Sequence, residues 1–127
     1  LLEEIQAKHG LTFVFITHSL NVVNHICDRV AVMYLGKIVE LSDCDELYDN
    51  PKHPYTQALL NAVPVPDPEV EKNREHSIMS GEVPSPINPP PGCVFHPRCS
   101  IAVPNCRSEV PDLNDKGAGH WVACSEI

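Results

Sequence analysis

The sequence predicts an α/β protein in which a regular half, residues 1–63, is followed by a proline-rich, cysteine-containing, irregular extension, residues 64–127. Three observations support this fold class. Residues 11–16 are almost all apolar, branched or aromatic, which is typical of a strand buried on both faces of a parallel sheet. Apolar residues recur with helical spacing on both sides of this run. Eleven of the thirteen prolines and four of the six cysteines come after residue 63.

The first half is predicted to alternate helices with strands. An amphipathic N-terminal helix is expected to end at Gly10, because glycine suits the position that follows a helix. Ser19 is a candidate N-cap for the helix that follows the apolar run. Residues 30–34 and 37–41 are expected to form two strands, joined by a two-residue turn that contains Gly36.

Two short helices are expected after the hairpin. Asp43 and Glu46 have the spacing of a capping box, which predicts a helix over residues 45–48. Pro54 fits the first turn of another helix. The apolar residues of this helix share one face and are Tyr55, Ala58, Leu59 and Ala62. Three prolines are expected to end it and begin an extended arm, namely Pro64, Pro66 and Pro68.

The charge and hydropathy of the chain exclude several classes of function. The formal net charge is -8 and no cluster of Lys and Arg exists, which argues against nucleic acid and against anionic lipid as partners. No apolar run approaches the roughly 20 residues that span a bilayer, so no direct membrane span is expected. The chain starts at Leu1, inside a predicted helix, and we expect an N-terminally truncated fragment.

His18 is the first candidate functional residue. It follows the predicted buried strand directly and precedes a helix. Ligands of open α/β sheets bind beyond the carboxyl ends of the strands, and an imidazole there can donate to a phosphate oxygen or orient a water. The alternative is a histidine that only satisfies local hydrogen bonds.

Three ordered stretches give His18 a context: residues 15–20 (FITHSL), 28–33 (DRVAVM) and 36–40 (GKIVE). Together they resemble the switch-histidine region of ABC-transporter ATPases. The resemblance implies that residues 1–63 are the C-terminal part of an ABC-type nucleotide-binding domain. It also implies that His18 is catalytic and contacts the γ-phosphate of ATP, which binds with Mg²⁺. The family more often has Asp where this chain has Ser19, and either residue can cap a helix.

Other elements of that family do not occur in this sequence. It has no phosphate-binding loop, no Leu-Ser-Gly-Gly signature and no upstream acidic strand end for magnesium. The expectation is therefore a fragment of an ATPase that has no measurable ATPase activity alone.

A narrower resemblance covers nearly the whole chain. Residues 53–60 (HPYTQALL), 81–88 (GEVPSPIN), 91–99 (PGCVFHPRC), 119–120 (GH) and 122–124 (VAC) are similar to the ATP-binding subunits of oligopeptide and dipeptide importers. This resemblance implies a second ATP-binding subunit and transmembrane permease subunits as partners. It also implies a location at the cytoplasmic face of the bacterial inner membrane.

Four cysteines form the second candidate site: Cys93, Cys99, Cys106 and Cys124. Five, six and seventeen residues separate them, which is unlike the closely spaced pairs of structural zinc sites. Disulfides need an oxidising compartment, whereas iron–sulfur clusters accept cysteines from separate loops. The resemblance to the importer subunits implies a 4Fe-4S cluster on these four residues, with zinc as the alternative. His96 is a further candidate ligand.

Two other functions remain as alternatives at this point. A free-standing, non-enzymatic metal-binding module would account for the cysteines but not for His18. A small metallohydrolase using His18, His25 and a carboxylate is disfavoured, because residues seven apart lie two helical turns apart, too far to share one metal.

Overall fold

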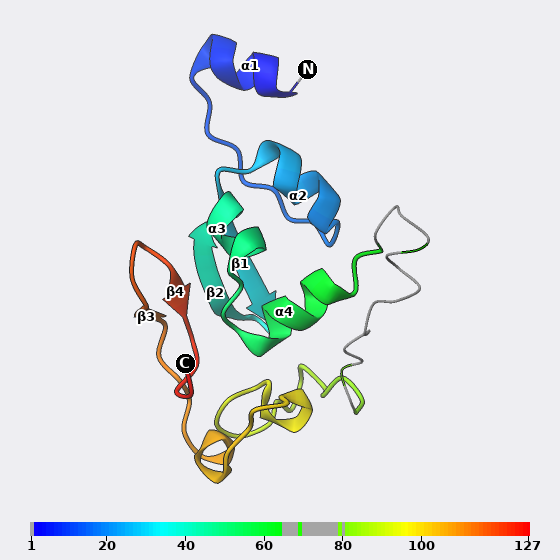
Figure 1. The fold of residues 1–127 in the computed structure, drawn as a ribbon, viewed down its shortest axis with the longest axis vertical. Coiled ribbons are helices and arrows are strands. Elements are labelled where there is room, and N and C mark those ends of the chain that lie inside the picture. The colour runs from blue at the N-terminus through cyan, green and yellow to red at the C-terminus, as the bar shows by residue number, and fades with distance from the viewer. Residues whose placement is uncertain (1, 65–68, 70–78, 80) are drawn as a thin grey trace.

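The computed structural model describes residues 2–64, 69, 79 and 81–127 (Figure 1). Pro66 and Pro68, predicted to begin an extended arm, lie outside the described residues. The described helices and strands are α1 Leu2–His9, α2 Leu20–Ile26, β1 Arg29–Tyr34, β2 Lys37–Asp43, α3 Cys44–Asp49, α4 Pro54–Asn61, β3 Asn114–Asp115 and β4 Trp121–Val122. Two 3₁₀-helices, η1 His96–Arg98 and η2 Pro104–Arg107, lie in the C-terminal part.

The predicted hairpin is confirmed. β1 and β2 pair antiparallel, and the turn residues Leu35 and Gly36 both have positive φ, 45° and 76°. Such a two-residue turn has the twist that antiparallel strands require. The register shifts between Val32 and Met33, so that Val32 faces Glu40 while Met33 faces Ile38. This β-bulge changes which residues of β2 point inward.

The sheet contains strands from both halves of the chain, in the order β1-β2-β4-β3. β4 pairs antiparallel with β2, with Glu40 opposite Val122 and Leu41 opposite Trp121. One more hydrogen bond, from the Ala123 amide to the Val39 carbonyl at 2.9 Å, extends this pairing. The described sheet is thus wholly antiparallel. The division of the chain at residues 63 and 64 stays a prediction.

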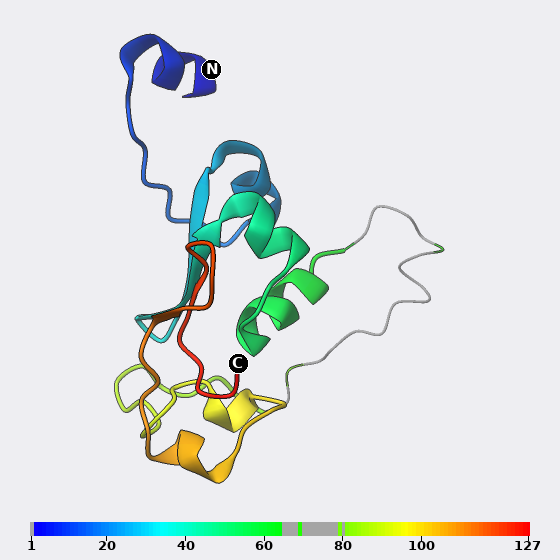
Figure 2. The same cartoon turned by 60° about the vertical axis from the view of Figure 1, so that its left-hand side comes forward.

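α3 and α4 lie on one face of the β1–β2 hairpin (Figure 2). They bury the inward side chains of β1 together with Leu47, which is 0% exposed. Phe95, from the C-terminal part, completes this core at 1% exposure. Its ring lies 5.2 Å from Tyr34 and 5.3 Å from Tyr55 in tilted or edge-to-face contact, the geometry that aromatic pairs prefer.

The helix ends agree only partly with the predicted caps. Pro54 begins α4 as expected, but the cap is the His53 ring, whose Nδ1 accepts from the Tyr55 amide at 3.1 Å. Asp43 occupies the N-cap position of α3 and Ser19 that of α2, yet neither side chain makes a capping hydrogen bond. The capping box predicted at Asp43 is therefore wrong, although the helix after it exists.

The N-terminal segment differs most from expectation. α1 ends before Gly10, whose φ is 60°, as predicted. However, α1 buries none of its residues, and Figure 1 shows it standing apart from the sheet. Residues 11–17 form no strand, and Val14 and Ile16 are 88% and 99% exposed. The physical reason is that a strand needs neighbours for its backbone groups, and no other described segment pairs with this one.

Among the described residues, none of the helices has the length and apolarity that crossing a membrane requires.

Candidate functional site

His18 lies between the exposed apolar segment and α2, and its side chain is exposed. The backbone around it is held by the Thr17 hydroxyl, which accepts a hydrogen bond from the Ser19 amide at 3.0 Å. Within the described part of the chain, no hydrogen bond or ion pair engages the His18 ring. The imidazole is therefore open to an incoming group, which is what a residue that contacts a phosphate or a water requires.

The expectation of a 4Fe-4S cluster is wrong. All four candidate cysteines are described, and all are free thiols. No group of three or more His, Cys, Asp or Glu side chains in the described residues could hold a metal ion, which also leaves zinc without a site. The ring of His96, the further candidate ligand, donates from Nδ1 to the Cys93 carbonyl at 2.9 Å instead.

The environment of two of these thiols opposes loss of the proton. Burial raises the pKa of Cys93 above its ordinary value, and the neighbouring thiols Cys106 and Cys124 raise it further. The pKa of Cys99 is raised for the same first reason, with contributions from the other three thiols. Metals bind the thiolate, so a raised pKa opposes ligation at neutral pH. Burial therefore favours the protonated thiol at Cys93 and Cys99.

A cluster of ionisable side chains, two of them buried, lies at the junction of β2, β4 and α3, where the sequence did not point to a site. Glu40 and His120 are 0% and 1% exposed, and His120 Nε2 lies 2.6 Å from a Glu40 carboxylate oxygen. The other ring nitrogen, Nδ1, lies 3.2 Å from a carboxylate oxygen of Glu46, whose side chain is 42% exposed. One imidazole therefore links a strand and a helix that precede it by many residues.

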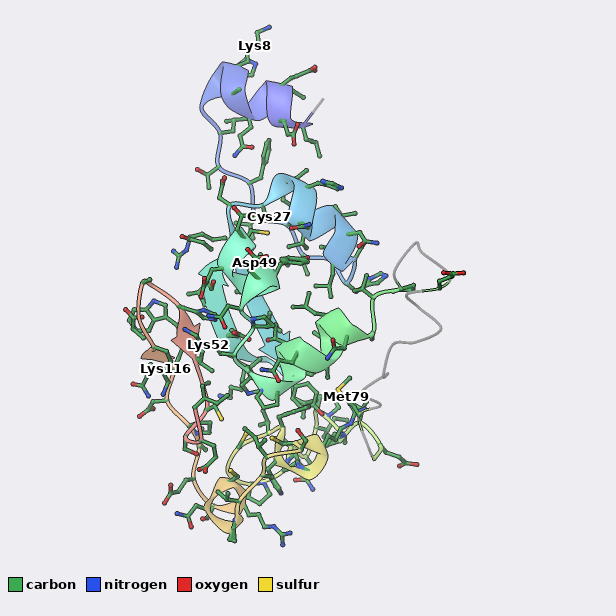
Figure 3. All side chains as sticks on the ribbon, in the orientation of Figure 1. Lys8, Cys27, Asp49, Lys52, Met79 and Lys116 are labelled. Atoms are coloured by element: carbon green, nitrogen blue, oxygen red, sulfur yellow. The ribbon has the colours of Figure 1, made fainter. Side chains whose placement is uncertain are left out.

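Glu40 also fixes the segment between α3 and α4. Its two carboxylate oxygens accept hydrogen bonds from the Lys52 amide at 2.7 Å and from the His53 amide at 3.1 Å. Figure 3 labels Lys52, between α3 and α4, and Lys116, directly after β3. Burial lowers the pKa of His53 to about 4, against the opposing effect of Glu40, so His53 is neutral at neutral pH.

Sequence reasoning missed Glu40 and Glu46 as members of a site, and it noted His120 only as part of a resemblance. One sequence signal could have found Glu40. It is the single acidic residue within a predicted strand of otherwise apolar residues and Lys37, and buried carboxylates are almost always paired.

Comparison with known proteins places the chain in a family. Residues 39–106 match the family described as "Oligopeptide/dipeptide transporter, C-terminal region". The chain is 54% identical over 124 residues to the oligopeptide transport ATP-binding protein AppF of Bacillus subtilis, and these residues make up 98% of the chain. It is 54% identical over all 127 residues to the oligopeptide transport ATP-binding protein OppF of Escherichia coli. The chain spans 38% of the length of each of these relatives.

These likenesses favour the ATPase-subunit hypothesis over a free-standing metal-binding module, because they run through His18, the hairpin and the cysteines without a break. The family match begins inside β2 and ends at Cys106, so it includes both helices that cover the sheet and most of the C-terminal part. The chain therefore belongs to the family of oligopeptide/dipeptide transporter proteins, of which it carries the C-terminal region.

Proposed function

We propose that the chain forms the C-terminal part of an ABC-type ATPase subunit that powers peptide import. The observation that carries this proposal is the 54% identity with OppF of Escherichia coli over the entire chain, since OppF is named an oligopeptide transport ATP-binding protein. The subunit would pair with a second ATP-binding subunit and act on transmembrane permease subunits. Its place would be the cytoplasmic face of the bacterial inner membrane.

Within this subunit, residues 1–63 would complete the nucleotide-binding domain and residues 64–127 would form a proline-rich extension. Strand β4 of the extension pairs with β2 of the domain, which supports a structural role for the extension. No three His, Cys, Asp or Glu side chains of the described residues gather into a group that could hold a metal ion. The magnesium ligands and the phosphate-binding loop would belong to the part of the relatives that this chain does not span.

His18 would be the residue that meets the γ-phosphate of ATP. Its exposed ring can donate an N–H to a phosphate oxygen and can hold the attacking water through the same edge. Mg²⁺, when bound with ATP, neutralises charge on the phosphates. Positioned proton-transfer groups contribute typically 10²- to 10⁴-fold to rate, so we expect a loss of about a hundredfold without the imidazole.

The test uses the complete subunit, reconstituted with its permease. His18→Ala should lower ATP hydrolysis and peptide uptake together by about a hundredfold while nucleotide binding persists. His25→Ala is the matched control, because His25 is also an exposed histidine and lies on α2, the helix that directly follows His18. Equal activity of His18→Ala and the unmodified subunit would refute the assignment. A coding region that lacks a phosphate-binding loop would refute the ATPase proposal as a whole.

A further inference from the structure

The sheet has an outer face, on the side of the β1–β2 hairpin that α3 and α4 do not cover (Figure 2). In an antiparallel sheet, residues that lie directly opposite each other point to the same side. The register therefore places Met33 of β1 beside Ile38 of β2, on this outer side. It also places Leu41 of β2 between Ala31 of β1 and Trp121 of β4. These five residues are called the outer apolar face below.

The outer apolar face is largely open to solvent in this chain. Met33, Ile38 and Trp121 are 56%, 40% and 37% exposed. Buried and exposed residues alternate along β1, so the opposite side of the same strands forms the core. An antiparallel sheet with one solvated face usually alternates apolar residues with polar ones. Here both sides are apolar, which indicates that a second layer covers the outer one.

Charged residues border the outer apolar face. Arg29 and Asp43 lie opposite each other at one end, with Arg29 Nε 3.7 Å from an Asp43 carboxylate oxygen. Asp115 of β3 lies opposite Trp121 at the side of the sheet. An apolar centre with a polar rim is the usual anatomy of a protein–protein interface, and Met and Trp are enriched there. This rim has no surplus of positive charge, which disfavours an anionic lipid surface as the partner.

The observations favour the rest of a longer chain as the partner. The chain spans 38% of the length of AppF and of OppF, so most of each relative lies outside it. A separate apolar surface, residues 11–16, is also uncovered here, with Val14 and Ile16 88% and 99% exposed. A second copy of the chain that meets the outer apolar face across a two-fold axis covers that face only. One larger neighbouring body accounts for both surfaces.

We propose that the outer apolar face, including Trp121 of the C-terminal part, docks against the part of the subunit that this chain does not span. That layer lies over β1, β2 and β4 at once, so it fixes the C-terminal strand β4 to the hairpin in addition to the pairing of β4 with β2. The inference rests on the proposed subunit only for the existence of a longer chain, and it requires no ATP hydrolysis.

Hydroxyl-radical footprinting read by mass spectrometry tests this docking, because Met and Trp side chains oxidise readily where solvent reaches them. We expect the oxidation rates of Met33 and Trp121 to fall about fivefold from the isolated chain to the complete subunit, since the centre of an interface excludes water. Ile87, which is 94% exposed and lies outside the sheet, is the control and should keep its rate. Unchanged rates at Met33 and Trp121 overturn the proposal. Protection of Met33 without Trp121 overturns its extension to β4.

Met33→Glu provides an independent test in urea unfolding. The midpoint of the isolated chain should not change, because the side chain already faces solvent there. The midpoint of the complete subunit should fall, because the docked layer would bury a charge without a partner. Val110→Glu, at a residue that is 69% exposed outside the sheet, is the matched control and should change neither midpoint. Equal midpoints of Met33→Glu and the unmodified complete subunit count against the docking.

Analytical ultracentrifugation of the isolated chain tests the competing partner, a second copy. We expect a monomer with Met33 and Trp121 open to oxidation. A stable dimer in which both side chains are already protected would show that a second copy covers the face, and it would overturn the proposal. If the complete subunit shows the expected footprint but lacks ATPase activity, the docking stands and only the proposed transport function fails.

Discussion

Gly92 is the position at which a single methyl group should be most damaging. Its φ is +69°, in the left-handed region. A Cβ there would lie 2.5 Å from the Cys106 carbonyl oxygen and 2.7 Å from backbone atoms of Arg107 and Ser108. These atoms belong to the end of η2 and cannot rotate away as a side chain can. The Cys93 amide, next in the chain, donates to the same Cys106 carbonyl at 2.9 Å.

The expected cost of Gly92→Ala has two parts. A left-handed conformation costs an alanine about 1–2 kcal/mol, and forcing extra volume against fixed atoms costs about 1–3 kcal/mol. We therefore expect the free energy of unfolding to fall by about 2–5 kcal/mol. Gly36→Ala is the matched control, because Gly36 has a φ of +76° with nothing within 4 Å of the added Cβ. This variant should lose only the backbone part, about 1–2 kcal/mol.

The assay is urea unfolding followed by Trp121 fluorescence and by circular dichroism, analysed by linear extrapolation. Coincident transitions by the two probes would establish that one cooperative unit unfolds. The difference between the two alanine variants then measures the contact with η2 alone. If Gly92→Ala costs no more than Gly36→Ala, the close packing of residues 91–93 against η2 is refuted.

Three further perturbations have expected outcomes. Burial lowers the pKa of His53 to about 4, so as the pH falls the unfolded chain binds a proton at this histidine before the folded chain does. The free energy of unfolding should therefore fall by up to about 3 kcal/mol between about pH 6.5 and about pH 4. His53→Asn keeps a helix-capping acceptor and should make the free energy of unfolding less dependent on pH in this range. Burial raises the pKa of Cys93 and Cys99, so iodoacetamide should label both more slowly at neutral pH than in the urea-unfolded chain, as mass spectrometry of the peptides would measure. Equal labelling rates would contradict the burial of these thiols. Ile16→Ser should change the stability of this chain by less than about 0.5 kcal/mol in urea unfolding, because Ile16 is 99% exposed.

Structural features that depend only on residues close together in the sequence were predictable. The hairpin could be predicted because its turn chemistry is local: Gly36 accepts a positive φ at no cost, and the strands on either side alternate. The start of α4 was predictable for the same kind of reason, since Pro54 has the backbone conformation of a first helical turn. The helix-ending Gly10 belongs to the same group.

The buried cluster could not be predicted, because a bulge reverses the alternation of β2. Strict alternation would place Val39 and Leu41 on one face of the strand and Glu40 on the other. In the structure Val39 has no partner on β1, and Glu40 faces Val32 in the interior. Which residue bulges depends on the packing of the whole sheet. The partner His120 is 80 positions away, and nothing local to either residue indicates their contact.

The metal prediction was wrong for a related reason. The spacing of four cysteines says how much chain separates the thiols, but a metal site depends on where the loops place them. Here the Cys93 amide donates to the Cys106 carbonyl, and Cys93 and Cys99 pack against the core that contains Phe95. Packing of this kind gathers cysteines as apolar side chains, which is how a free cysteine behaves in a protein interior.

The apolar segment at residues 11–16 was predicted to be a buried strand, and the structure leaves it exposed and without strand pairing. Its side chains suit a strand that is covered on both faces, yet Val14 and Ile16 are exposed and the segment pairs with no other described residues. Exposed apolar runs of this kind mark interaction surfaces. If the proposed subunit is correct, the remainder of the protein supplies the neighbouring strands, and the burial of residues 11–16 would fix the position of His18 at the end of the strand. The prediction of a buried strand would then hold for the complete subunit, where Ile16→Ser should be destabilising although it is neutral in this chain.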